Sequence, residues 1–262
     1  MIDFQNVSFS YGEESSGGGI RNVNLTINTG EFVLLTGESG CGKTTITRLV
    51  NGLVPHYYEG NLEGDVLLDG KSVSDTPLYD LAAMVGSVFQ NPKSQFFNVD
   101  TDSELAFACE NLGYPQEDIL KRIDRTVSDY HIEDLMGRSV FALSGGEKQK
   151  IACASSSVVL PGIMVLDEPS SNLDMAAIDD LRQVLSLWKK QGKTILIAEH
   201  RLYYLHDLAD RVLYVKDGEI EREYTPAEFD SLSDGTRKEM GQRPFSLSKL
   251  KPANQYQAHT AK

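Results

Sequence analysis

The segment EFVLLTGESGCGKTTITRLV constrains the fold more than any other stretch of the 262 residues. An apolar run at 31–37, typical of a strand buried on both faces, leads into GESGCGKT at 37–44, and a helical pattern follows. The spacing G-x-x-x-x-G-K-[ST] between a strand and a helix indicates a phosphate-binding loop. Glycines let successive backbone N–H groups turn toward one point, the helix N-terminus adds partial positive charge, and Lys43 adds a full charge.

The same loop predicts a Mg²⁺-dependent nucleotide site, because Thr44 supplies a hydroxyl group suited to that ion. Cys41 is interpreted as a small side chain that the loop tolerates. The residues that we expect to contact the nucleotide here are Gly37, Ser39, Gly40, Cys41, Gly42, Lys43, Thr44 and Thr45.

Short apolar runs alternate with helical patterns along much of the chain. Runs at 163–169 and 194–200 flank a helical pattern with an expected N-cap at Asp174 and an expected stop at Gly192. This alternation predicts an α/β fold with a mainly parallel sheet and helices on both of its faces. The stretch 91–158 has helical patterns and no strong strand signal, which predicts an inserted helical subdomain.

The two ends of the chain lack this alternation of apolar runs and helical patterns. Alternating patterns at 2–11 and 20–28 predict half-buried strands joined by a Gly/Ser-rich connector. The pair at 217–218, Asp-Gly between two alternating runs, predicts a hairpin. Beyond about 243 the chain is polar and aperiodic, which predicts a disordered tail or a linker.

Acidic residues and a histidine follow two of the predicted strands. Asp167 and Glu168 end one strand and His200 ends another, and in open α/β sheets ligands bind at such strand ends. Asp167 could hold Mg²⁺ directly or through water, and Glu168 could orient or deprotonate an attacking water. The alternatives are a strand that merely ends at the surface and a structural histidine.

Two further residues are candidates with open alternatives. Gln90 follows the apolar run MVGSVF and could reach Mg²⁺ or water, or be a polar loop residue. Tyr11 ends the first predicted strand and could stack on a base, or lie at the edge of the core.

A second glycine turn lies in LSGGEKQK at 143–150. Ser144, Gly145 and Gly146 precede a helical pattern, so the turn indicates a helix N-terminus able to bind an anion without a lysine. Such a site is too weak alone to hold a nucleotide tightly. It could complete a site whose other half lies elsewhere.

Charge and composition exclude several classes of protein. The formal net charge of −13 argues against a nucleic-acid binder, although one local site can still be positive. The three cysteines have no CxxC spacing, which favours reduced thiols over a zinc site. No apolar run approaches the ~18 residues that a membrane helix needs. The N-terminus has no secretory pattern, so we expect a cytoplasmic chain.

The order of these elements resembles the nucleotide-binding subunit of ATP-binding cassette (ABC) transporters over residues 1 to about 225. The matching elements are GESGCGKT, Gln90, LSGGE, IMVLDE, SNLD at 171–174, and His200. The resemblance implies a P-loop NTPase fold with an antiparallel β subdomain and the inserted helical subdomain at 91–158. It also implies an ATPase that uses ATP and Mg²⁺, followed by a C-terminal extension at 226–262.

The resemblance further implies a role for each matching residue. Tyr11 would stack on adenine, and Lys43 and Thr44 would bind the phosphates and Mg²⁺. Gln90 would sense Mg²⁺ and link to a membrane partner. Glu168 would be the catalytic carboxylate and His200 the γ-phosphate contact.

In the family two cassettes pair head to tail. The turn at 144–146 would therefore contact the nucleotide of a second ATPase domain, and the loop at 171–174 would meet that domain. The implied location is the cytoplasmic face of the cell membrane, beside integral membrane subunits that select the transported substrate. Whether the chain pairs with itself, with another chain or with a fused second cassette stays open.

A finer resemblance points to the ATPases of energy-coupling factor (ECF) importers of vitamins or transition metals. It rests on QNPKSQFF, on EHRL at 199–202, and on NGLVPHYYEG. Phe96 and Phe97 could line a groove for a partner helix or belong to the subdomain core. The alternatives to a transporter ATPase are a soluble ABC-type ATPase in DNA repair or translation and a nucleotide-dependent regulatory module.

Overall fold

The structure is a computed structural model that describes residues 1–12, 18–243 and 245. Part of the predicted connector, 13–17, and most of the predicted tail, 246–262, lie outside the described residues. Within the described chain the strands are β1 Ile2–Tyr11, β2 Gly19–Ile27, β3 Phe32–Thr36, β4 Gly60–Leu68, β5 Lys71–Ser72, β6 Val85–Val88, β7 Ile163–Asp167, β8 Thr194–Ala198, β9 Arg211–Lys216 and β10 Glu219–Tyr224. They form two sheets.

The larger sheet has the strand order β10-β9-β3-β8-β7-β6. All its neighbouring pairs are parallel except β9 and β10, which form an antiparallel hairpin. The hairpin turns at Asp217 and Gly218, whose φ angles of 49° and 83° suit the left-handed turn that Asp-Gly favours. The predictions of a mainly parallel sheet and of this hairpin are both confirmed.

The strand β3 shows why the central strands read as continuous apolar runs. Phe32 and Leu34 belong to one buried hydrophobic cluster, and Val33 and Leu35 belong to the other. Successive side chains of a strand point to opposite faces, so a sheet covered on both faces leaves no polar positions. The phosphate-loop segment therefore starts in the centre of the molecule.

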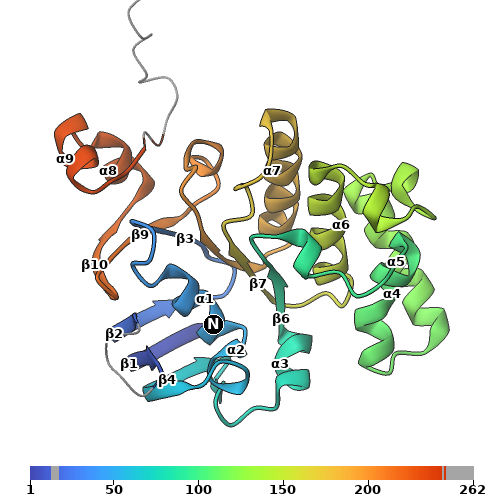
Figure 1. Ribbon diagram of the computed structural model, residues 1–262, viewed down its shortest axis with the longest axis horizontal. Coiled ribbons are helices and arrows are strands. Elements are labelled where there is room, and N and C mark those ends of the chain that lie inside the picture. The colour runs from blue at the N-terminus through green and yellow to red at the C-terminus, as the bar shows by residue number, and fades with distance from the viewer. Residues whose placement is uncertain (13–17, 244, 246–262) are drawn as a thin grey trace, which may run out of the picture.

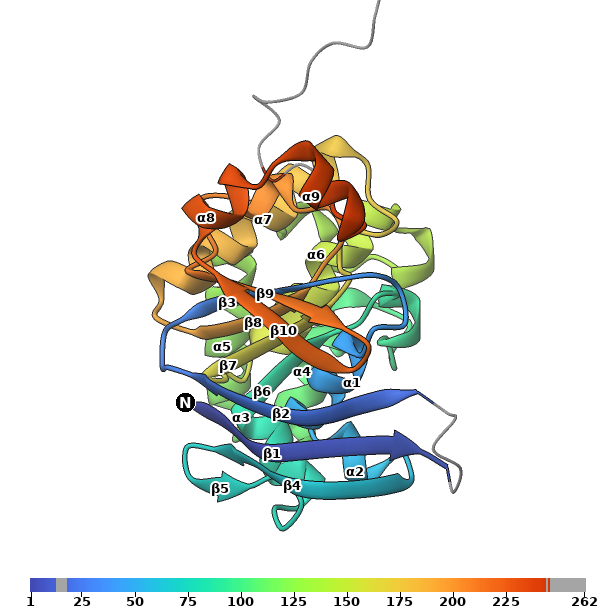
Figure 2. The same ribbon diagram turned by 90° about the vertical axis from the view of Figure 1, so that its left-hand side faces the viewer.

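The smaller sheet, β2-β1-β4-β5, is antiparallel throughout. Its inward side chains share a cluster with Ile46 and Leu49 of helix α1 and with Leu196 of β8. Figure 2 shows this sheet lying below the larger one, with α1 close to both. The antiparallel β subdomain implied by the resemblance is present.

The helices cover the larger sheet and extend beyond it. They are α1 Lys43–Val50, α2 Leu53–His56, α3 Leu78–Met84, α4 Thr101–Asn111, α5 Gln116–Tyr130, α6 Gly145–Ser157, α7 Met175–Lys190, α8 Pro226–Ser231 and α9 Asp234–Glu239. Short 3₁₀ turns lie at Pro92–Ser94, Glu133–Leu135, Val140–Ala142 and Tyr203–Leu205. Helix α7 begins after Asp174, whose side chain accepts a hydrogen bond from the Ala177 N–H at 2.9 Å, as predicted for an N-cap.

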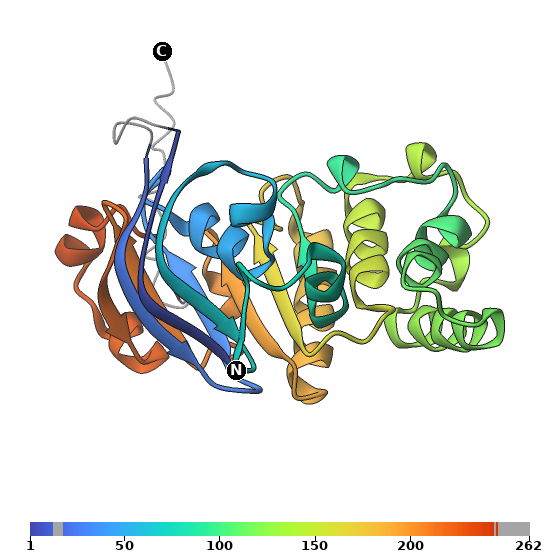
Figure 3. The ribbon, with the colours of Figure 1, turned by 90° about the horizontal axis from the view of Figure 1, so that it is seen from below.

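Helices α4, α5 and α6 occupy the end of the molecule opposite the antiparallel sheet (Figures 1 and 3). Between positions 91 and 158 no strand forms, and one isolated bridge joins Asp100 to Ser139. A small separate core of Cys109, Ile119 and Val158 holds these helices together. The helical character predicted for this stretch is confirmed. That it forms a separate subdomain stays a prediction.

Regular structure continues beyond residue 225. Helices α8 and α9 follow β10, and Phe229 and Phe245 are fully buried in the main core. The sequence patterns did not indicate these two short helices. Among the helices of the described residues, none combines the length and the apolar character needed to cross a membrane.

Candidate functional site

The phosphate loop connects β3 to α1 and needs glycine at two positions. Gly37 has φ 153°, and a Cβ atom there would lie 2.1 Å from the carbonyl oxygen of Val215. Gly42 has φ 111°, and a Cβ atom there would lie 2.9 Å from Ile20 Cγ2. Any larger residue would clash or strain the backbone at both positions. The loop conformation therefore follows from the glycine spacing of the sequence.

Lys43 is the first residue of α1 and is 4% exposed. Its Nζ donates hydrogen bonds to the carbonyl oxygens of Gly37 at 3.0 Å and Glu38 at 2.9 Å. Through these bonds the side chain at the end of the loop is tied back to the backbone at the start of the loop. Cys41 is buried with its Sγ 3.7 Å from the same Nζ, while Ser39 and Gly40 are exposed.

Thr44 and Asp167 meet at the carboxyl ends of the strands. Thr44 Oγ1 donates a hydrogen bond to Asp167 Oδ1 at 3.1 Å. Burial raises the pKa of the Asp167 carboxyl, and the bond from Thr44 partly offsets this effect. A hydroxyl and a carboxylate in contact are a fitting partial set of ligands for Mg²⁺, which is usually bound through one or two carboxylates, water and phosphate oxygens.

No group of three or more His, Cys, Asp or Glu side chains in the described part of the chain could hold a metal ion by itself. The Thr44 hydroxyl and the Asp167 carboxylate are oxygen donors of the kind that Mg²⁺ takes together with phosphate oxygens and water. Thr44 and Asp167 are the residues that would hold it.

Glu168 lies next to this pair, at the first position after β7. Its φ of 45° is uncommon for a residue with a side chain. Its Oε2 accepts a hydrogen bond from Gln90 Nε2 at 3.1 Å, and its Oε1 lies 3.1 Å from His200 Nε2. The carboxylate is 23% exposed and the imidazole 31% exposed, so both remain accessible to a ligand. The Gln90 amide and the His200 imidazole thus contact the two oxygens of one carboxylate and fix its direction.

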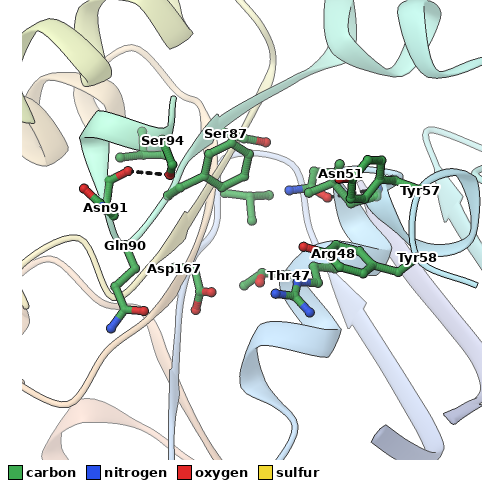
Figure 4. A pocket seen from close by; sticks show the side chains of 14 residues that line it. Thr47, Arg48, Asn51, Tyr57, Tyr58, Ser87, Gln90, Asn91, Ser94 and Asp167 are labelled. Carbon is green, nitrogen blue, oxygen red and sulfur yellow. Dashed lines mark hydrogen bonds between the residues drawn. The ribbon is translucent and has the colours of Figure 1, made fainter. Parts of the chain in front are cut away.

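A cavity of about 500 Å³ opens beside these residues. Figure 4 shows Gln90 and Asp167 on one side of it and Arg48, Tyr57 and Tyr58 on the other. Of the site residues described above, Gln90 and Asp167 line this cavity, which extends from the strand ends toward α1 and α2.

Tyr11 contacts the helix that carries the phosphate loop. Its hydroxyl lies 3.3 Å from Thr45 Oγ1 and accepts a hydrogen bond from Arg48 Nη1 at 3.0 Å. The guanidinium of Arg48 also lies over the Tyr58 ring, 4.1 Å from its centre. The aromatic residue that was predicted to stack on a base is thus anchored through Arg48, a residue that no sequence pattern singled out.

The second glycine turn caps helix α6. Ser144 and Glu147 form reciprocal hydrogen bonds, with the Ser144 N–H donating to Glu147 Oε2 at 2.7 Å and the Glu147 N–H to Ser144 Oγ at 3.3 Å. A Cβ atom on Gly146 would lie 2.8 Å from the Cβ of Ala177, so glycine lets α6 approach α7. The hydrogen bonds from Ser144, with a further one from Arg138, lower the pKa of Glu147 to about 2.

The turn is exposed and stands apart from the phosphate loop of the same chain. Asn172 and Asp174 of the SNLD loop line the same surface hollow as Ser144 and Gly145. No hydrogen bond or ion pair between described residues links the turn at 144–146 to the loop at 37–44. The structure therefore brings Thr44, Gln90, Asp167, Glu168 and His200 together, and leaves the second turn on another part of the surface.

Comparison with known proteins gives one family. The sequence model of the family described as "ABC transporter" matches residues 20–171. A Treponema denticola protein named "Putative ABC transporter ATP-binding protein" is 46% identical over 251 residues, which cover 96% of this chain and 51% of the relative. The chain thus spans about half the length of this curated relative.

Two solved structures share the fold. CbiO1 of Clostridium perfringens, described as part of the ABC transporter complex cbiONQ, superposes with a TM-score of 0.77 at 27% identity, over 90% of this chain and 93% of that one. The ATP-binding cassette MJ0796, solved as a dimer in a post-hydrolysis state with ADP and Pi, superposes with a TM-score of 0.72 at 28% identity, over 86% of this chain and 99% of that one.

Proposed function

The chain belongs to the ABC transporter family of ATP-binding proteins, and from this membership we propose that it hydrolyses ATP in a pair with a second ATPase domain and thereby drives a membrane transporter. The family match and the shared fold identify an ABC-type ATPase domain. The roles of individual residues, the pairing and the membrane partner are parts of the proposal.

The observation that carries the proposal is the position of the Glu168 carboxylate. It lies between Gln90 and His200 at 3.1 Å from each, and the neighbouring residue, Asp167, contacts Thr44 of the phosphate-loop helix. A carboxylate held at a strand end beside a phosphate loop is suited to accept a proton from a water that attacks a phosphate.

Each residue contributes a separate part of the chemistry. The loop N–H groups and Lys43 bind the phosphates and offset their negative charge. Thr44 and Asp167 would hold a Mg²⁺ ion, which when bound would supply further positive charge to the phosphates. Glu168 takes the proton of the attacking water, and His200 holds the Glu168 carboxylate in place while its ring remains within reach of the transferred phosphate.

The second glycine turn supports a paired arrangement. The turn presents the N-terminus of a 13-residue helix at exposed Ser144 and Gly145, and among the described residues no hydrogen bond or ion pair joins it to the phosphate loop of its own chain. MJ0796 forms a dimer of similar domains. We infer that the turn completes the nucleotide site of the second ATPase domain.

Exposed apolar side chains support a membrane partner. Phe97, Val99 and Phe141 are 73%, 64% and 76% exposed. The Val140 N–H donates to the Val99 carbonyl oxygen at 2.9 Å, which joins the two segments that carry them. Exposed apolar surface of this kind marks interaction sites. We propose that these side chains, together with Gln90, contact an integral membrane subunit at the cytoplasmic face of the membrane.

The transporter class is the finest part of the proposal. The segments QNPKSQFF, EHRL and NGLVPHYYEG resemble ECF importer ATPases, and CbiO1 is described as part of the ABC transporter complex cbiONQ. We propose an importer of a vitamin or a transition metal, with the membrane subunits selecting the substrate.

Purification of the tagged protein from detergent-solubilised membranes of its source tests this function. We expect an integral membrane protein and a second ATPase domain to copurify, with Mg²⁺-dependent ATP hydrolysis in the assembled complex. Copurification with ribosomes or DNA and no membrane protein would contradict transport. A nucleotide-binding complex with no steady-state hydrolysis would instead indicate a regulatory module.

A further inference from the structure

The residue before His200 is a buried carboxylate that accepts four hydrogen bonds. Glu199 is 2% exposed. Its Oε1 accepts hydrogen bonds from the N–H groups of His200 at 2.8 Å and Arg201 at 3.1 Å. Its Oε2 accepts from the Tyr204 hydroxyl at 2.8 Å and from the Ser170 N–H at 3.3 Å. A buried carboxylate is costly unless it is fully hydrogen-bonded, so this turn is organised around Glu199.

One of these bonds crosses to the loop that follows Glu168. Ser170 is fully buried, and its N–H reaches Glu199. Arg201, on the other side of His200, donates from Nη1 to the carbonyl oxygen of Leu173 at 2.9 Å. The residues on either side of His200 therefore hold the loop 168–174 at two points.

A third bond joins the loop 168–174 to the last residue of β8, just before the turn that carries His200. The Glu168 N–H donates to the carbonyl oxygen of Ala198 at 2.8 Å. The φ of 45° at Glu168 is a strained conformation that persists only where the surrounding contacts fix it. The bonds at Ala198, Glu199 and Arg201 are such contacts.

The side-chain contact between Glu168 and His200 depends on these backbone positions. A hydrogen bond of 3.1 Å is lost when its partners separate by about half an ångström or more. A misplacement of about 1 Å in a reacting group can cost on the order of 100-fold in rate. We therefore expect the rate of hydrolysis to depend on the distance between the loop 168–174 and the turn that carries His200.

The loop 168–174 has an outward side as well. Asn172 and Asp174 line the surface hollow shared with the turn at 144–146. A displacement of this loop by a second ATPase domain would reach His200 through the bonds of Glu199 and Arg201.

We propose that Glu199 and Arg201 are positioning residues that lock the loop 168–174 to the turn carrying His200. The Glu168–His200 pair then moves as one unit with the surface that faces the second ATPase domain. This role rests on the proposed function, because it assigns Glu168 and His200 to ATP hydrolysis. It gives a purpose to Glu199 and Arg201, which have none in the catalytic step itself.

Two variants and one control test the proposal. Glu199→Gln replaces an acceptor oxygen by a donor in the buried turn, and Arg201→Ala removes only the bond to Leu173 from a half-exposed side chain. Glu31→Gln is the matched control, because Glu31 also accepts from a backbone N–H (Asn28, 2.8 Å) and from an arginine (Arg211, 3.0 Å). Glu31 precedes β3, whereas the phosphate loop follows that strand.

The first readout is steady-state ATP hydrolysis by the intact protein with its partners. We expect both positioning variants to lower kcat by about 10-fold to 100-fold, with KM for ATP changed by less than about 2-fold, because the loop at 37–44 is untouched. Glu31→Gln should keep the wild-type kcat. Wild-type kcat in both positioning variants, or a KM that rises in step with the fall in kcat, would overturn the proposal.

The second readout is the NMR signal of the His200 imidazole, assigned by its loss in His200→Ala, one of five histidines. In Glu199→Gln and Arg201→Ala we expect this signal to move toward its position in Glu168→Gln, where the carboxylate is neutralised. It should not move in Glu31→Gln. An unchanged signal in a folded positioning variant would overturn the proposal.

The two readouts separate the two hypotheses. If Glu168→Gln hydrolyses ATP at the wild-type rate, the proposed function fails, whatever the NMR signal shows. If Glu168→Gln is inactive and the positioning variants keep both kcat and the His200 signal, only the positioning role fails. Should Glu199→Gln not fold, Arg201→Ala alone decides the question.

Discussion

At Glu168 the side chains of Gln90 and His200 hold one carboxylate from both sides, each at 3.1 Å. Glu168→Gln keeps the size of the side chain but removes its ability to take a proton. We expect kcat for ATP hydrolysis to fall by on the order of 10²–10⁴-fold while the affinity for ATP stays within about 2-fold. Steady-state kinetics and a titration with a fluorescent ATP analogue measure the two quantities. Near-normal turnover would remove Glu168 from the mechanism.

Lys43 should give the opposite pattern. Its ammonium group bonds to the Gly37 and Glu38 carbonyl oxygens of the phosphate loop, and under the proposed function it binds the phosphates of ATP. Lys43→Ala removes a full positive charge, so we expect the Kd for ATP to rise by about 10-fold or more, consistent with about 1.5–3 kcal/mol for a charged hydrogen bond. Lys190→Ala, at the exposed end of α7, is the control. Unchanged binding in Lys43→Ala would mean that the loop does not hold the nucleotide.

Among the elements, α6 offers a test by pH. The pKa of Glu147 is lowered to about 2 from its ordinary value of 4.5, because the folded state binds its charged form through Ser144 and Arg138. The stability linked to this charge is therefore present above pH 4.5 and is lost as the pH falls toward 2. We expect Glu147→Gln to be less stable than wild type by about 1 kcal/mol at pH 7, and this difference to shrink below pH 4.5.

Urea unfolding at a series of pH values between 7 and 3 measures this difference. Glu117→Gln is the control, since Glu117 is an exposed acid in the first turn of α5 without a reciprocal cap, and its ion pair with Lys121 should contribute little. A pH-independent difference for Glu147→Gln would contradict the role of its charge.

The segment that follows α9 bonds to the strand that leads into the phosphate loop. Thr36, the last residue of β3, is fully buried, and its hydroxyl donates to Gln242 Oε1 at 2.5 Å. Gln242→Ala would leave that buried hydroxyl without its acceptor, so we expect a loss of about 1–3 kcal/mol in the free energy of unfolding. Gln242→Glu keeps an acceptor oxygen and should lose less. Equal stability of Gln242→Ala and wild type would show that the contact contributes nothing.

The elements that the sequence predicted well are those with a local signal. The buried strands β3, β7 and β8 are continuous apolar runs, the cap of α7 is an aspartate at the expected position, and the hairpin has an Asp-Gly turn. Each of these features depends on a few adjacent residues, so a single sequence is enough to find them.

The features that the sequence did not predict depend on long-range contacts. The bond between Thr36 and Gln242 joins residues 206 positions apart, and helices α8 and α9 are too short to give a periodic pattern. Glu199 was visible only as part of EHRL, and its four donors come from a turn and a loop that the fold brings together. No spacing rule encodes such contacts.

In the molecule as a whole, we propose that the two glycine turns serve two different nucleotides. The loop at 37–44 would bind the ATP of this chain, and the turn at 144–146 would complete the site of the second ATPase domain. The two turns have no direct bond within the described chain, so each can be changed separately.

The most direct test is the affinity of the Ser144→Arg chain for a fluorescent ATP analogue, measured beside wild type and Lys43→Ala. We predict a Kd within about 2-fold of wild type, together with a fall in kcat of at least about 10-fold in the assembled complex, because only the second site loses its helix N-terminus. A Kd that rises as far as it does in Lys43→Ala would contradict the claim, since both turns would then bind the same nucleotide.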